Sequence, residues 1–160
     1  MSRHKEVRGI FEKVPSVAKG VFVAPTAAVV GSVKIGVNSN IWYGAVVKGD
    51  ATKVTIGDNT NVREGALVAS SKKGGTITIG NNVSIGAGAF VGAATVGDNA
   101  SIGAGANVAD GAVIEKGGAV ADGALVPADI TIPSGQVWKL CEYSWLGIVV
   151  LDFFHFKRLE

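Results

Sequence analysis

Residues 79–114 read IGNNVSIGAGAFVGAATVGDNASIGAGANVADGAVI, and an aliphatic residue returns in them every six positions, usually followed by glycine. A single step, from Val91 to Val96, is shortened to five. Self-similarity at this period indicates a parallel β-helix, in which each unit contributes a short strand and a tight turn. The in-phase series extends in both directions and comprises Ile35, Ile41, Val47, Ile56, Val62, Val68, Ile79, Ile85, Val91, Val96, Ile102, Val108, Ile114, Val120 and Val126.

Three units make one triangular coil of about 18 residues, so each in-phase aliphatic points inward and stacks on its equivalents in the neighbouring coils. The composition agrees with a narrow solenoid, because hydrophobic residues make up 48% of the chain but aromatic residues only 7%. The 23 glycines and the recurring Asn suit corners that need a positive φ. We therefore predict an all-β fold.

Besides the shortened step, two insertions break the period. Three extra residues stand between Val47 and Ile56, around Asp50-Ala51-Thr52, and five stand between Val68 and Ile79, in the polar run 70–75. Insertions in a solenoid go to loops on one face. We expect both to project as loops from corners.

The chain divides into a lead segment over 1–20, the β-helix over 21–137 and a C-terminal capping or partner-binding segment over 138–160. The last segment is rich in aromatic and aliphatic residues, and a solenoid needs a cover for its last coil. We expect an apolar α-helix from about Tyr143 to Lys157, lying on the coil or on a neighbouring subunit. Peripheral contact of 143–157 with a membrane surface is the alternative.

Several functional classes are disfavoured. The formal net charge of +2 is too small to indicate a nucleic-acid partner. A single cysteine, Cys141, excludes an internal disulfide and fits a reducing compartment. No apolar run is long enough to span a membrane as a helix, and the start lacks the apolar core of a secretory signal.

Residues 20–138 resemble the γ-class carbonic anhydrase family of left-handed β-helix proteins. The stretches that carry the resemblance include SNIWYGAVVKGD (39–50), IGDNTNVREGALV (56–68) and GALVPADITIPSGQVW (123–138). The resemblance implies a left-handed helix and a trimer. It also departs after Trp138, where the family continues with a Gly-Asn-Pro-Ala-type turn and this chain has Lys139-Leu140-Cys141-Glu142.

Active members of that family bind zinc at subunit interfaces through three His, two from one subunit and one from its neighbour. Matching the motifs places these ligands at Ala69, Ala87 and Gly92 of this chain. Neither Ala nor Gly offers a lone pair to a metal. The only His of the chain, His4 and His155, lie outside the solenoid and not at metal-ligand spacing. The resemblance therefore implies that the zinc site and its catalysis are lost, with no cofactor.

Residues that support the family's site are altered as well. The family's Arg-Gly-Asp becomes Lys48-Gly49-Asp50, and in the family this Arg and Asp make contacts across the subunit boundary. Arg63 stands where the family has a Gln that orients the zinc-bound water, and its positive charge opposes a nearby dication. Glu64 stands where the family has Asp. We predict Lys48, Asp50 and Arg63 at the subunit interface and assign catalysis to none of them.

The resemblance implies a non-catalytic, structural γ-carbonic-anhydrase-like subunit of a heterotrimer with His-bearing paralogues. By family analogy, this trimer belongs to the matrix-side module attached to the membrane arm of mitochondrial respiratory complex I. One alternative is an active γ-type carbonic anhydrase or a hexapeptide acyltransferase, although the absence of His between Val7 and Tyr143 counts against both. Another is a homotrimeric scaffold or adaptor outside complex I, in the cytoplasm.

Overall fold

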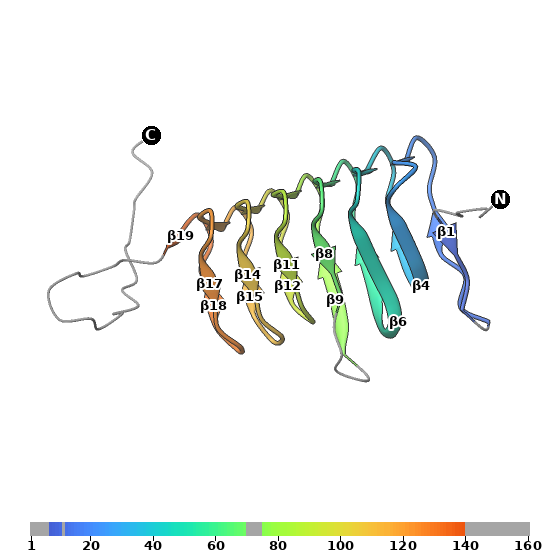
Figure 1. Cartoon of the computed structure of the whole chain (residues 1–160). Coiled ribbons are helices and arrows are strands. Elements are labelled where there is room, and N and C mark those ends of the chain that lie inside the picture. Colours follow the sequence, from blue (N-terminus) through green and yellow to red (C-terminus); the bar gives the residue numbers. More distant parts are fainter. Residues whose placement is uncertain (1–6, 11, 70–74, 140–160) are drawn as a thin grey trace, which may run out of the picture.

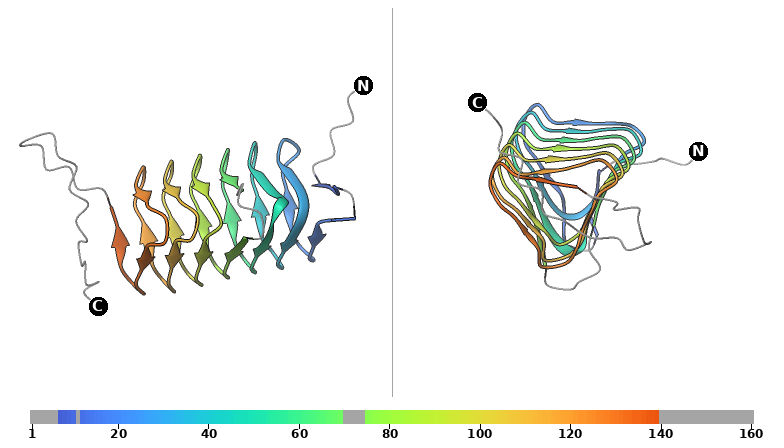
Figure 2. Two further views of the ribbon diagram at one scale, coloured as in Figure 1. Left: turned by 90° about the horizontal axis from the view of Figure 1, so that it is seen from below. Right: turned by 90° about the vertical axis from the view of Figure 1, so that its left-hand side faces the viewer.

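The structure, a computed structural model, describes residues 7–10, 12–69 and 75–139. These residues form a row of triangular coils in which each strand pairs in parallel with its equivalents in the neighbouring coils, and the strands at the two ends of the row pair on one side only (Figure 1). Viewed along the axis, successive coils superpose as a triangle (Figure 2). The prediction of an all-β, left-handed parallel β-helix is confirmed.

The strands line three flat faces. Face 1 holds β1 (Val7–Arg8), the first part of β4 (Ala28–Ile35), the first part of β6 (Val46–Ile56), β8 (Leu67–Val68), β11 (Phe90–Val91), β14 (Asn107–Val108) and β17 (Leu125–Val126). Face 2 holds β2 (Ser16–Val17), the second parts of β4 and β6, β9 (Thr76–Ile79), β12 (Thr95–Val96), β15 (Val113–Ile114) and β18 (Thr131–Ile132). Face 3 holds β3 (Phe22–Val23), β5 (Asn40–Ile41), β7 (Asn61–Val62), β10 (Ser84–Ile85), β13 (Ser101–Ile102), β16 (Ala119–Val120) and β19 (Val137–Trp138).

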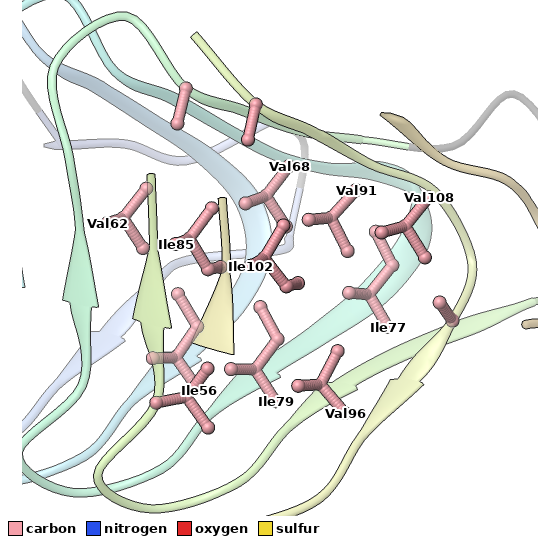
Figure 3. Packing of buried hydrophobic residues seen from close by; sticks show 14 of the residues in the cluster. Ile56, Val62, Val68, Ile77, Ile79, Ile85, Val91, Val96, Ile102 and Val108 are labelled. Atoms are coloured by element: carbon pink, nitrogen blue, oxygen red, sulfur yellow. The ribbon is translucent and has the colours of Figure 1, made fainter. Parts of the chain in front are cut away.

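The core is the stack of in-phase aliphatics inside the triangle. The second residue of nearly every two-residue strand points inward, and Ile41, Val62, Ile85 and Ile102 on face 3 are at most 1% exposed. Figure 3 shows Val62, Ile85 and Ile102 converging with inward side chains from the other two faces. Burying a Val or Ile side chain contributes about 1.5–3 kcal/mol, so the six-residue period is the main source of stability. At the last described coil, Trp138 is buried and its indole N–H donates to the Leu125 carbonyl over 2.8 Å.

The chain turns between faces at three corners, which we name by the faces that they join. At corner 2/3 four Asn, residues 38, 59, 82 and 99, adopt positive φ values of 52–57°. Side chains at this corner also bind the coil before them: Asp58 Oδ1 accepts from the Val37 N–H and Asp98 Oδ1 accepts from the Asn81 N–H, both over 2.7 Å. Turn backbone groups that the strands leave free are thereby satisfied.

The first insertion is not a loop, so that prediction was wrong. Residues 50–52 lie within the continuous strand β6, which pairs with β4 on both sides of a register shift: Gly31 pairs with Gly49, and Val33 pairs with Val54. The three extra residues bulge at corner 1/2, where Thr52 is buried. Continuous pairing and a buried side chain hold them in the wall of the solenoid. Residues 70–74 of the second insertion lie outside the described residues.

The segments that flank the repeat are described only in part. In the lead segment, β1 and β2 pair with β4 and extend faces 1 and 2 by one strand each. The expected C-terminal helix over 143–157 lies outside the described residues. Over 7–10, 12–69 and 75–139 there is no helix of the length and apolar character needed to cross a membrane.

Candidate functional site

The predicted ligand positions 69 and 92 lie together at corner 1/2. Val68 pairs with Val91, so Ala69 and Gly92 follow equivalent strands, β8 and β11, in neighbouring coils. The Ala69 N–H donates to the Val91 carbonyl over 3.0 Å. Parallel strands lie about 4.8 Å apart, so side chains at these two positions leave the wall side by side. This corner is where two ligands from one chain could reach one ion.

Ala87 lies at the other end of face 1, at corner 3/1, in the turn between β10 and β11. Its carbonyl accepts the Gly105 N–H of the next coil over 2.8 Å. The strand β11 therefore separates Ala87 from Gly92. The structure groups the three positions as a pair, Ala69 and Gly92, and a single residue, Ala87.

The residues at corner 1/2 do not fit a zinc site. Ala69 presents a methyl group and Gly92 only hydrogen, whereas Zn²⁺ needs nitrogen, sulfur or carboxylate oxygen ligands. Within the described part of the chain, no group of three or more His, Cys, Asp or Glu could hold a metal ion. The nearby carboxylate of Asp110 is already engaged, since its Oδ1 accepts the Ala93 N–H over 2.6 Å.

Asp110 also occupies the space beside Gly92. A Cβ added at the buried Gly92 would collide with Asp110 Oδ1, so any side chain at 92 requires this carboxylate to move. Asp110 was not among the residues predicted from the sequence. The repeat contains a signal for it, because Asp110 follows Gly92 by 18 residues, the length of one full coil.

Lys48 and Asp50 lie on β6 and pair within the chain. Lys48 Nζ lies 3.5 Å from Asp50 Oδ2, and both side chains remain partly exposed. The pKa of the Asp50 carboxyl lies below its usual range because it accepts a hydrogen bond from the Ala51 N–H and faces Lys48, while partial burial acts in the opposite direction. Lys13 Nζ donates to the Asp50 carbonyl over 3.1 Å. Contact of this pair with a neighbouring subunit stays a prediction.

Arg63 lies at corner 3/1, one coil before Ala87. Its backbone N–H donates to the Ile85 carbonyl over 3.0 Å. Its side-chain Nε lies 3.4 Å from Glu64 Oε2. The side chains of Arg63 and Glu64 are 57% and 46% exposed. A fixed positive charge thus stands next to the position of the third ligand, where it disfavours a second cation.

The outward side chains of face 1 form a surface that the sequence analysis did not identify. Val46, Leu67, Phe90 and Leu125 occupy equivalent outward positions, with the polar Asn107 between Phe90 and Leu125 the exception, and Leu125 is 45% exposed. The corresponding outward positions of face 2 are polar, namely Lys34, Thr55, Thr78, Thr95 and Thr131, with Val113 the exception. The residue before each in-phase aliphatic points outward, so its type determines whether a face is mostly apolar or mostly polar.

Comparison with known proteins finds relatives over most of the chain. Gamma carbonic anhydrase 2, mitochondrial, and gamma carbonic anhydrase 1, mitochondrial, both of Arabidopsis thaliana, are 44% and 47% identical over 143 residues, or 86% of this chain. These matches cover 51% and 52% of the two proteins, so the chain spans about half the length of these curated relatives.

Among solved structures, a hexapeptide transferase family protein from Anaplasma phagocytophilum has a TM-score of 0.74 and 39% identity. The match covers 78% of this chain and 72% of the chain of that protein. No family model matches the chain.

Proposed function

Because this chain belongs to the γ-class carbonic anhydrase family of left-handed β-helix proteins, we propose that it is a subunit of a trimer that keeps the family's shape without its zinc site. One observation carries the proposal: where the wall would present two zinc ligands side by side, it presents the methyl of Ala69 and the bare backbone of Gly92. The third position, Ala87, is equally without a donor.

The subunit interface is proposed to lie on face 1. If two ligand positions come from one subunit and one from the next, corner 1/2 of one chain faces corner 3/1 of its neighbour. Face 1 lies between these corners and therefore points toward the trimer axis. The apolar outward side chains of face 1 support this orientation, because association buries apolar surface, and the charged residues Lys48, Asp50 and Arg63 lie at its edges.

Because this chain lacks all three ligands, we propose that it assembles into a heterotrimer. This chain contributes to two interfaces, through its two corners, and completes a zinc site at neither. In a trimer with two His-bearing paralogues, the one interface between those paralogues keeps a full ligand set. The role of this chain is then to build the trimer, and catalysis is left to its partners.

We further place the subunit in the mitochondrion, on the matrix side of the inner membrane, in the carbonic-anhydrase module of complex I. Its relatives are named mitochondrial gamma carbonic anhydrases, which supports the compartment. Co-purification of the tagged chain with His-bearing paralogues and membrane-arm subunits is the expected result. A soluble self-trimer recovered alone would instead favour a scaffold outside complex I.

Zinc content tests the loss of the metal site directly. We expect the purified chain to retain far less than one zinc per subunit after dialysis, and a triple variant, Ala69→His, Ala87→His and Gly92→His, to gain zinc. A matched variant that restores only the residues at 69 and 92 should bind zinc more weakly, because it lacks the ligand from the neighbouring subunit. Retention of near one zinc by the unmodified chain would contradict the proposal.

A further inference from the structure

Charge is segregated along the axis of the solenoid. Among the described residues, the first coils over 7–56 carry six cations, Arg8, Lys13, Lys19, Lys34, Lys48 and Lys53, against two acids, Glu12 and Asp50. The last coils over 90–139 carry five acids, Asp98, Asp110, Glu115, Asp122 and Asp129, against two cations, Lys116 and Lys139. The coils are stacked in a row, so the molecule has a positive and a negative end (Figure 1).

Five of the N-terminal cations gather around corner 1/2, and we call them the basic patch: Arg8, Lys13, Lys34, Lys48 and Lys53. Register places Arg8 of β1 beside Val30 of β4, which in turn lies beside Lys48 of β6. Lys34 and Lys53 are exposed on the part of β4 and β6 that belongs to face 2. Lys13 reaches the same corner through its bond to the Asp50 carbonyl.

Exposed aliphatic side chains accompany this patch. Val14, next to Lys13, is 71% exposed, and Val17 of β2 is 40% exposed. The strand β1 and the turn that follows it, which carries Lys13 and Val14, lie at the N-terminal end of the row (Figure 1). Cations beside a projecting aliphatic side chain are typical of surfaces that bind anionic bilayers, where ammonium groups meet headgroup phosphates and the aliphatic group enters the interface.

We propose that the basic patch docks the N-terminal end of the solenoid on an anionic lipid bilayer, with the acidic end directed into water. Lys34 and Lys53 lie exposed on face 2, so they remain available when face 1 and the edge that carries Lys48 are buried between subunits. The proposal does not depend on the absence of the zinc site. It is also separate from contact through residues 143–157, because a charge-driven contact weakens with salt and an apolar insertion does not.

The test is co-sedimentation of the full chain with two kinds of vesicle, phosphatidylcholine alone and phosphatidylcholine mixed with phosphatidylglycerol. The variant Lys34→Glu/Lys53→Glu changes the patch, and the control Lys116→Glu/Lys139→Glu makes the same change in net charge at the acidic end. We expect binding to the anionic vesicles only, lowered by salt. Because each near-surface cation contributes a factor of about five, the patch variant should lose roughly thirty-fold or more in affinity, while the control loses little.

Three results would overturn the proposal. Equal loss in the patch variant and the control would show that net charge, not the patch, drives binding. Binding to neutral vesicles that resists salt would assign the contact to apolar insertion elsewhere in the chain. Binding of a polyglutamate peptide without binding of vesicles would identify the partner as an acidic protein. Circular dichroism and gel filtration of each variant confirm that it is folded before its binding is measured.

Discussion

Gly92→Ala should destabilise the protein through a single displaced carboxylate. The φ of Gly92 is not in the left-handed region, so its backbone accepts alanine, but the new Cβ collides with Asp110 Oδ1. The carboxylate must then release the Ala93 N–H. Losing a hydrogen bond to a charged acceptor costs about 1.5–3 kcal/mol, and the lower chain entropy of alanine in the unfolded state offsets about 0.4–1 kcal/mol of this. The expected net loss is about 1–2 kcal/mol.

A double-mutant cycle isolates this contact. In an Asp110→Ala background the nearest remaining atoms to the added Cβ are the backbone nitrogen of residue 110 at 3.1 Å and the Val108 carbonyl oxygen at 3.2 Å. Gly92→Ala should then cost less than about 1 kcal/mol, which gives a coupling of about 1–2 kcal/mol. Equilibrium urea unfolding followed by circular dichroism, at one protein concentration, measures all four variants. An equal cost in both backgrounds would refute the reasoning.

Three further predictions concern the wall and the corners. Ile85→Ala, in a side chain that is 0% exposed, should cost about 2–5 kcal/mol in urea unfolding, whereas Ser84→Ala on the outer side of the same strand should stay within about 0.5 kcal/mol. Gly36→Ala places a Cβ 2.5 Å from a backbone carbonyl carbon of the next coil, so we expect little folded protein by gel filtration. The control Gly65→Ala has open space around the new Cβ but a φ of 66°, so it should lower the free energy of unfolding by only about 1 kcal/mol. Asp50→Asn should destabilise at neutral pH, and the difference from the unmodified protein in thermal melts should close in acid. The lowered pKa of the Asp50 carboxyl means that its contribution is complete above the ordinary value of 3.8 and is lost as the pH falls through the lowered value.

Motif matching predicts the positions of the candidate site from the sequence, but it does not give their geometry. Motif matching placed Ala69, Ala87 and Gly92, and the absence of donor atoms at these positions follows from residue type alone. Which two of them share a corner depends on the pairing of β8 with β11, and that register depends on how many residues the run 70–75 adds. The 18-residue spacing places Asp110 one coil after Gly92, but only the stacked structure shows that its Oδ1 accepts the Ala93 N–H.

The first insertion shows the same limit. Extra residues in a repeat are usually extruded, yet residues 50–52 stay in β6 because pairing with β4 resumes beyond them and Thr52 finds a buried position. The sequence shows the number of extra residues but not whether a neighbouring strand holds them. Local pattern decides where a coil turns, and contacts between coils decide how an irregularity is accommodated.

The sequence by itself determined the solenoid, its inward core and its lack of zinc ligands. A six-residue period places every in-phase aliphatic on the inner side of a coil, so local spacing specifies the coil, and Ala or Gly at the three motif-matched positions offers no donor atom to a metal. Only the tertiary structure decided that the mostly apolar outward residues of face 1 share one surface, that Asp110 Oδ1 stands beside Gly92, and that Arg8, Lys34 and Lys53 gather at one corner. These features join residues one or more coils apart, and the register between coils is a property of the folded chain.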